Sequence, residues 1–302
     1  MNPVIQTKQL SKKFKHDYGL QPTDFNLYEG EICAIIGRNG AGKSTLFKLI
    51  ANQIHPTSGS IKLFGEDGYN INNQGRKRVG FMIETPEFIS NFTAYQNLHY
   101  FSIQRGVTNS EKLEEVLTLV GLKNITKKVK QYSLGMKQRL GIALALLTGP
   151  DILVLDEPIN GLDAQGIKSF RDLILKLNEE NGITILISSH ILNELQQLAY
   201  RFVFIENGEI IEDISKEQML SKGKRQLIIK VDKPESAVRI LEEHIENINY
   251  KVLHNKEIVI EPPNIESSDI NKLLLNNNIE VEEFKIETTN LEDYFLNKGV
   301  GN

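Results

Sequence analysis

A glycine-rich segment near the start of the chain has the spacing of a phosphate-binding loop. It reads Gly37-Arg38-Asn39-Gly40-Ala41-Gly42-Lys43-Ser44. Glycines let the backbone turn its N–H groups toward phosphate oxygens, and a helix that begins near Lys43 adds its positive end. Lys43 can then reach the β- and γ-phosphates of a nucleotide, while Ser44 can ligate Mg²⁺. The segment predicts nucleotide binding, with Thr45 as a further contact; a simple glycine-rich turn before a helix is the alternative.

Acidic and imidazole side chains close two apolar segments further along the chain. Asp156 and Glu157 end the run 151–158, and His190 ends the run 182–190. Beside a phosphate loop, Asp156 can hold the Mg²⁺ shell and Glu157 can polarise the water that attacks a γ-phosphate. His190 can contact the same phosphate. The alternatives are two exposed acids that open a turn and a structural histidine at a strand end.

Three short apolar runs are expected to form the sheet that positions these residues. They lie within residues 31–36, 151–158 and 182–190, and their apolar residues follow one another instead of alternating with polar ones, which is typical of parallel strands buried on both faces. Functional side chains of such sheets gather at the carboxyl ends of the strands. A helix is expected over residues 43–52, and the helix-periodic residues 93–147 indicate a helical insertion into this α/β domain.

The composition changes near residue 222, where asparagine, glutamate and isoleucine become frequent. The pattern there predicts strand 225–231, a helix from Pro234, strands near 249–260, a helix near 268–275, strand 279–286 and helix 290–297. This order indicates a small two-layer α+β domain. We therefore expect one domain over residues 1–221 and an accessory domain over residues 222–302.

The composition also limits the classes of function. The chain has 35 Lys plus Arg against 39 Asp plus Glu, so it lacks the basic excess of proteins that bind nucleic acid without regard to sequence, and we expect no nucleic-acid partner. No stretch reaches the ~18 uninterrupted apolar residues of a membrane span, and the first residues lack the apolar core of a secretory signal. Cys33, the single cysteine, is expected to be a buried small apolar residue in a reducing compartment, not a catalytic thiol.

Over about residues 3–220, the motifs resemble those of the ATP-binding subunits of ABC transporters, in the family's order. Residues 37–44 match the Walker A loop. Residues 151–158 match the Walker B strand with its catalytic Glu157, and His190 matches the switch histidine. The resemblance implies the fold of a P-loop nucleoside triphosphatase with a helical insertion, ATP and Mg²⁺ as cofactors, and ATP hydrolysis.

A second group of residues resembles the segments that this family uses between two subunits. Tyr132-Ser133-Leu134-Gly135-Met136 is similar to the signature motif, although Leu134 replaces its first glycine and Met136 replaces glutamine. Asn160-Gly161-Leu162-Asp163 resembles the D-loop. The resemblance implies a head-to-tail dimer around two ATP molecules, in which Ser133, Gly135 and Asp163 act on the partner's ATP. From the residues alone, Ser133 is equally an N-cap of the helix that follows.

Two single residues carry the rest of the resemblance. Phe14 falls where the family stacks an aromatic ring on adenine. Glu84, in Gly80-Phe81-Met82-Ile83-Glu84-Thr85-Pro86, stands where most of the family has a glutamine, and glutamate there is similar to the subset that exports bacitracin and lantibiotics. A carboxylate can still ligate Mg²⁺, so the expected metal ligands are Ser44, Asp156 and Glu84. A solvated loop glutamate is the alternative.

The resemblance favours an ATPase that powers export of a drug or peptide antibiotic through separate membrane permeases, at the inner face of the cell membrane. Residues 290–296 also resemble the tail of such subunits. The alternatives are a soluble ABC ATPase without a transport role and an exporter of an unrelated substrate. The short interval from Ser44 to Ser133 has no sustained heptads, which disfavours a DNA-repair ATPase with long coiled coils. Asn-Lys pairs at 255, 271 and 297 lack the aspartate that reads guanine in GTPases, so we expect ATP.

Overall fold

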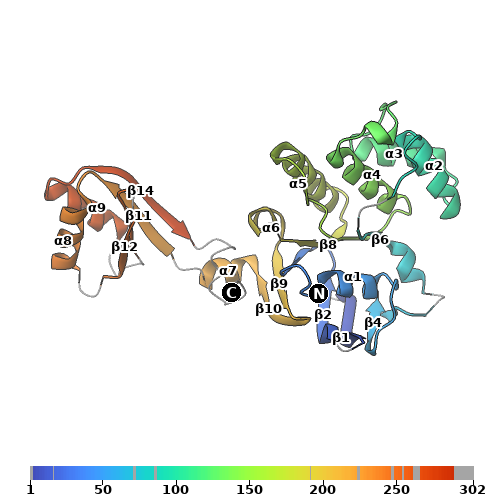
Figure 1. Cartoon of the computed structure of the whole chain (residues 1–302), viewed down its shortest axis with the longest axis horizontal. Helices are drawn as coiled ribbons and strands as arrows, with labels where there is room; N and C mark the ends of the chain where they lie inside the picture. The colour runs from blue at the N-terminus through green and yellow to red at the C-terminus, as the bar shows by residue number, and fades with distance from the viewer. Residues whose placement is uncertain are drawn as a thin grey trace. The chain divides into compact units, whose positions relative to one another are not determined.

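The computed structural model describes residues 3–15, 17–70, 73–84, 87–190, 192–222, 225–245, 248–253, 255–260 and 266–288. Two compact units divide the chain, the first ending at Lys216 and the second beginning at Glu217 (Figure 1). The division lies a few residues before the expected boundary at 221, because helix α7 (Lys216–Lys222) groups with the second unit from its second residue.

A six-stranded sheet forms the centre of the first unit. Its order is β10-β9-β3-β8-β7-β6. Strands β6 to β9 and β3 run parallel, and β10 pairs antiparallel with β9. The bounds are β3 (Ile32–Ile36), β6 (Val79–Met82), β7 (Ile152–Leu155), β8 (Thr184–Ser189), β9 (Arg201–Glu206) and β10 (Glu209–Ser215). Every residue of β3, β7 and β8 is buried, so the continuous apolar runs are confirmed as a doubly covered parallel sheet.

Side chains of β8 alternate between two layers that cover the sheet. Leu186 belongs to the main core together with Leu46 and Phe47 of helix α1 (Lys43–Ile50). Ile187, the next residue, lines a small cavity with residues of α5 (Ala164–Glu179) and α6 (Leu192–Leu198). Residues two apart in a strand share a face, so Ser188 lies on the α1 side of the sheet, as does Leu186.

A second sheet packs against α1. This sheet was not predicted from the sequence. It is antiparallel in its assigned pairs, with order β2-β1-β4-β5, and consists of β1 (Pro3–Phe14), β2 (Asp17–Tyr28), β4 (Ser58–Leu63) and β5 (Glu66–Asp67). Leu10, Leu20 and Phe25 from this sheet join the same core as α1 and β3. Helix α1 therefore lies between two sheets (Figure 1).

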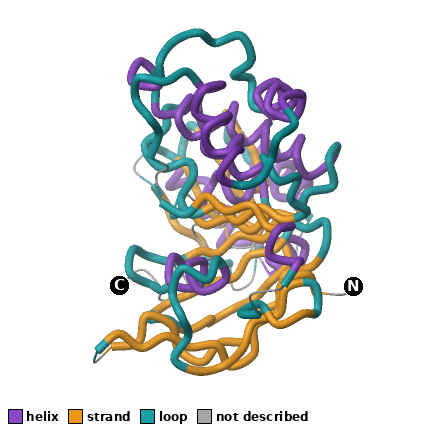
Figure 2. Tube along the Cα trace, turned by 90° about the vertical axis from the view of Figure 1, so that its right-hand side faces the viewer, coloured by secondary structure: helices purple, strands orange, loops and turns teal. Residues whose placement is uncertain are grey.

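The helical insertion lies at the end of the unit opposite the antiparallel sheet (Figures 1 and 2). It contains α2 (Ala94–Gln104), α3 (Ser110–Leu119) and α4 (Leu134–Leu146), with the short 3₁₀ turn η2 (Val129–Gln131) between α3 and α4; another, η1 (Gln74–Arg78), precedes β6. Thr93 begins α2 with a capping box, since its hydroxyl accepts from Gln96 N while the Gln96 side chain accepts from Thr93 N. These helices match the helical insertion expected over residues 93–147.

The second unit is a βαββαβ arrangement with its own core. Its elements are β11 (Arg225–Val231), α8 (Pro234–His244), β12 (Tyr250–Val252), β13 (Glu257–Ile260), α9 (Ser267–Asn276) and β14 (Val281–Thr288). The sheet order is β12-β13-β11-β14 with antiparallel pairs throughout, a split βαβ topology that confirms the two-layer α+β prediction. The helix expected over 290–297 lies outside the described residues.

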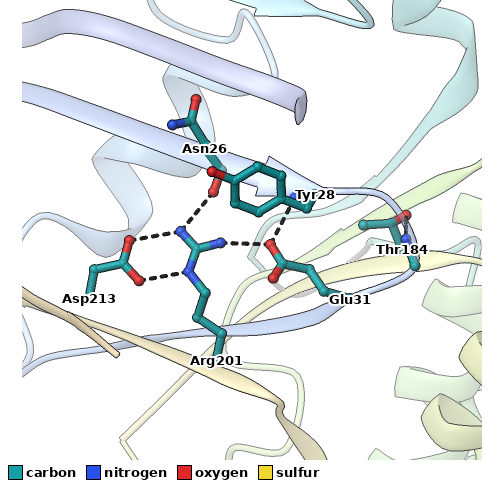
Figure 3. A network of polar contacts seen from close by, with 7 residues as sticks. Asn26, Tyr28, Glu31, Thr184, Arg201 and Asp213 are labelled. Atoms are coloured by element: carbon teal, nitrogen blue, oxygen red, sulfur yellow. Dashed lines mark hydrogen bonds and ion pairs between the residues drawn. The ribbon is translucent and has the colours of Figure 1, made fainter. Parts of the chain in front are cut away.

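An ion cluster ties the two sheets of the first unit together (Figure 3). Arg201 of β9 donates to Glu31 Oε1 at 2.7 Å, to both carboxylate oxygens of Asp213 at 2.6 and 2.8 Å, and to the carbonyl oxygen of Asn26 at 2.9 Å. Its guanidinium also lies 5.3 Å from the centre of the Tyr28 ring. Burial raises the pKa of Glu31, and the Arg201 charge acts in the opposite direction. The cluster lies at the amino ends of β3 and β9.

Candidate active site

The glycine-rich loop leaves the carboxyl end of β3 and enters α1 through backbone angles that suit glycine. Gly40 has φ +83° and Gly42, the residue before α1, has φ +111°. A Cβ at Gly42 would lie 2.7 Å from Gly19 O, and one at Gly37 would lie 2.4 Å from Ile205 O. Gly40 and Gly42 are therefore required for their backbone conformation, and Gly37 and Gly42 because a side chain would not fit.

Lys43 is buried under this loop, with 5% of its surface exposed. Its Nζ donates to Gly37 O at 2.7 Å and to Arg38 O at 3.2 Å. The residues Arg38, Asn39, Gly40 and Ser44 are exposed around it. The loop thus encloses one cation while its rim faces solvent, which is an arrangement suited to an incoming phosphate.

Glu157 links the loop to the neighbouring strands. Its Oε1 lies 3.2 Å from Lys43 Nζ, and its Oε2 lies 2.8 Å from His190 Nδ1. Oε1 is buried and makes no hydrogen bond among the described residues, so the ion pair is its polar contact there. The structure therefore brings the three residues predicted to be catalytic, Lys43, Glu157 and His190, into one chain of contacts.

The hydroxyl of Ser188, a residue not predicted to belong to the site, forms hydrogen bonds with both Asp156 and Glu157. Ser188 Oγ donates to Asp156 Oδ1 at 2.6 Å and accepts from Glu157 N at 2.9 Å. The parallel register pairs Leu155, the last residue of β7, with Ile187, which brings Asp156 beside Ser188 of β8. Buried serines at the carboxyl end of an apolar run were the available signal, but the partners of Ser188 depend on this register.

Phe14 lies close to the start of α1. A Cβ added at Gly19 would lie 2.6 Å from the Phe14 ring and 3.2 Å from Thr45 Oγ1, so both side chains border the Gly19 backbone. Phe14 is 48% exposed, and Lys12 Nζ lies 5.3 Å from the centre of its ring. An exposed ring beside the phosphate loop is suited to stacking on a base.

The predicted metal ligands are oxygen donors, the type that Mg²⁺ prefers. Two of them, Ser44 in the first turn of α1 and Asp156 directly after β7, would leave coordination positions for phosphate and water. Asp156 is 8% exposed. Among the described residues, Glu84 forms no hydrogen bond or ion pair with Ser44 or Asp156. Its Oε1 accepts from Lys48 Nζ at 2.6 Å, and this bond lowers the pKa of Glu84. The donor chemistry of Ser44 and Asp156 therefore suits Mg²⁺, whereas the structure gives Glu84 a different partner.

The residues predicted to act on a partner's nucleotide gather around one surface cavity of about 410 Å³, whose lining includes neither Lys43 nor Glu157. Ser133 is the N-cap of α4 and accepts from Met136 N at 3.3 Å, and Asp163 is the N-cap of α5 and accepts from Gly166 N at 2.8 Å. Gly135 lies in the same lining. Ser133 is therefore an N-cap within its own chain, as the local pattern allowed.

Comparisons with known proteins cover both units. A family model described as "ABC transporter" matches residues 20–160. The bacitracin transport ATP-binding protein BcrA of Bacillus licheniformis is 38% identical over 297 residues, which is 98% of this chain and 97% of BcrA. The lantibiotic transport ATP-binding protein SrtF of Streptococcus pyogenes is 43% identical over 209 residues, 69% of this chain and 89% of SrtF.

Solved structures show the same fold. An ATP-binding cassette determined as a dimer in a post-hydrolysis state, bound to ADP and Pi, superposes with a TM-score of 0.63 at 27% identity, covering 70% of this chain and 98% of that one. Within the residues that the structure describes, no helix combines the length and the apolar character that crossing a membrane requires.

Proposed function

The chain belongs to the ATP-binding subunits of the ABC transporter family, which are ATPases, and we propose that it drives the export of a peptide antibiotic through separate membrane permeases. The observation that carries this proposal is the alignment with BcrA. It spans 98% of this chain and therefore includes the second unit as well as the nucleotide-binding unit. The similarity to the lantibiotic transport protein SrtF supports the same class of cargo.

The proposed reaction is in-line attack of water on the γ-phosphate of ATP. The loop N–H groups and Lys43 bind the phosphates and stabilise the charge that develops on them. Glu157 orients and polarises the attacking water, while His190 holds the second oxygen of the Glu157 carboxylate. Mg²⁺, held by Ser44 and Asp156, would neutralise charge on the β- and γ-phosphates.

We further propose that two copies pack head to tail around two ATP molecules. Ser133 and Asp163 are exposed at helix N-termini, where backbone N–H groups attract anions. The dimeric cassette bound to ADP and Pi supports this assembly. ATP would close the dimer and hydrolysis would reopen it, at the inner face of the cell membrane against the permeases.

Resistance of cells to antibiotics tests the cargo. Cells that express the chain with its native membrane partners are exposed to a panel of lantibiotics, bacitracin and unrelated drugs. Glu157→Gln is expected to keep ATP binding and to lower turnover about 100-fold or more, because the amide cannot polarise water as a carboxylate does. Resistance to one peptide class should disappear in this variant.

Glu179→Gln is the matched control, because it makes the same chemical change at an exposed position near the end of α5. It should keep wild-type resistance. If the Glu157→Gln cells are as resistant as wild type across the panel, the peptide-export proposal is wrong. If the purified variant keeps its turnover, Glu157 is not the principal base.

A further inference from the structure

We propose that Ser188 is a positioning residue for ATP hydrolysis, whose single hydroxyl fixes the carboxylate of Asp156 and the backbone of Glu157 in one arrangement. The proposal rests on the roles proposed above for Asp156 and Glu157. It adds a third residue, which acts through Asp156 and Glu157.

Both contacts of this hydroxyl are short. Ser188 Oγ lies 2.6 Å from Asp156 Oδ1 and 2.9 Å from Glu157 N. A hydroxyl donates one hydrogen and accepts others, so one side chain can serve an acceptor and a donor at once. From the neighbouring strand, Ser188 therefore bonds both Asp156, the proposed metal ligand, and Glu157, the proposed base.

Burial makes these contacts hard to replace. Ser188 is fully buried, with 0% of its surface exposed, and Asp156 is 8% exposed. Without the hydroxyl, the Glu157 N–H and one oxygen of Asp156 would lose their partner where solvent has little access. The chain would then have to shift at residues 156–157 to recover hydrogen bonds.

Glu157 is the residue most sensitive to such a shift. Its backbone has φ +47°, a left-handed conformation that residues other than glycine rarely adopt. Surrounding contacts must maintain this conformation. The same residue aims its carboxylate at Lys43 and His190. Because Ser188 binds the N–H of this strained residue, it helps to determine where the carboxylate points.

A purely structural role for Ser188 is the competing explanation, and strand β8 offers a matched control. Thr184 lies on the same face of β8 as Ser188, four residues earlier, and is 1% exposed. Its hydroxyl also accepts from a backbone N–H, that of Gly30, at 2.9 Å. Thr184 bonds no carboxylate of the site, so Thr184→Val removes a comparable hydroxyl at the other end of the strand.

The experiment compares Ser188→Ala, Ser188→Thr and Thr184→Val in the full chain. Thermal unfolding, equilibrium ATP binding, kcat and KM for ATP are measured for each. Ser188→Ala should lower kcat about 10- to 100-fold with little change in ATP affinity, because misplacing reacting groups slows chemistry more than binding. Thr184→Val should lose similar thermal stability and keep its kcat. Ser188→Thr retains the hydroxyl and should recover most of the turnover.

Equal kcat in Ser188→Ala and Thr184→Val at similar stability would overturn the proposal, as would a Ser188→Thr variant no better than Ser188→Ala. If Ser188→Ala does not fold, Ser188→Cys, whose thiol is a weak donor, should show the same selective loss of kcat. Glu157→Gln serves as the reference. If Glu157→Gln keeps its turnover, the proposed role of Glu157 is wrong. If Glu157→Gln is slow but Ser188→Ala is not, only the proposed role of Ser188 is wrong.

Discussion

Lys43 and Glu157 form an ion pair at the centre of the site, with 3.2 Å between Lys43 Nζ and Glu157 Oε1. Lys43 Nζ also donates to two loop carbonyls, so the loop is built around an ammonium that is already in place. An incoming γ-phosphate must then share Lys43 with Glu157. This shared contact would hold Glu157, the proposed base, next to the phosphate on which we propose that it acts.

Glu84 is the residue for which sequence and structure suggest different partners. We predict that Glu84→Gln will reduce transport-linked resistance more than ATP binding, because Glu84 ties the segment after β6 to Lys48 on α1. The bond with Lys48 lowers the pKa of Glu84, so the ion pair is present at neutral pH and is lost as the pH falls through that lowered pKa.

Lys48→Gln is the companion variant, because it breaks the same ion pair and leaves the carboxylate in place. If the ion pair is what matters, both variants should lose resistance to a similar extent. Equal loss of ATP binding and resistance in Glu84→Gln would contradict a coupling role. Resistance assays in cells and ATP-binding titrations of the purified chain provide the two measurements.

The sequence predicted the phosphate loop residue by residue because the motif is local: its glycines, Lys43 and Ser44 follow one another along the chain. Ser188 and Lys48 were missed for the opposite reason. Their roles depend on the register between β7 and β8 and on the packing of α1, and neither arrangement can be derived from spacing within one segment.

At the scale of elements, the antiparallel sheet β2-β1-β4-β5 shows why some strands of the first unit were not predicted from the sequence. Strand β1 shifts register against β2 near Thr7 and Leu10, and Gln9 within it has φ +46°. Such irregularities interrupt the alternation of buried and exposed residues by which a half-buried strand is recognised. Strands β3, β7 and β8 are buried on both faces, so they can be recognised as continuous apolar runs without any alternation of buried and exposed residues.

The ion cluster between the sheets gives a prediction at this scale. Arg201→Met should lower the free energy of unfolding by about 3 kcal/mol, because it leaves the largely buried Glu31 without its cation. The pKa of Glu31, already raised by burial, should rise further. A carboxyl with a raised folded pKa favours the folded state at low pH, and this contribution is lost as the pH rises through that pKa.

Urea unfolding of Arg201→Met should therefore show a smaller loss at mildly acidic pH than at neutral pH. Adding Glu31→Gln removes the titrating group and should make the loss nearly independent of pH. A deficit in Arg201→Met that does not vary with pH would show that packing, not the unpaired carboxylate, accounts for it.

At the scale of the whole molecule, each unit has a hydrophobic core of its own. The first core includes Leu10, and the second includes Leu241 of α8; both side chains are fully buried. Since neither core draws residues from the other unit, we predict two unfolding transitions in calorimetry instead of one.

The substitution Leu241→Ala should lower only one transition, by about 2–5 kcal/mol of unfolding free energy, and should leave ATP binding intact. Leu10→Ala makes the same change in the first core and should lower the other transition. A single transition that both variants lower together would show that the two units unfold as one.

Cys33 allows these units to be studied by chemical labelling. It is the single cysteine of the chain, it is fully buried in β3, and burial raises the pKa of its thiol well above the usual value. Thiol reagents attack the thiolate, so the folded protein should be inert toward them. A cysteine introduced at any exposed position would be the one reactive thiol, and fluorophores or spin labels could be attached to either unit without first removing a native residue.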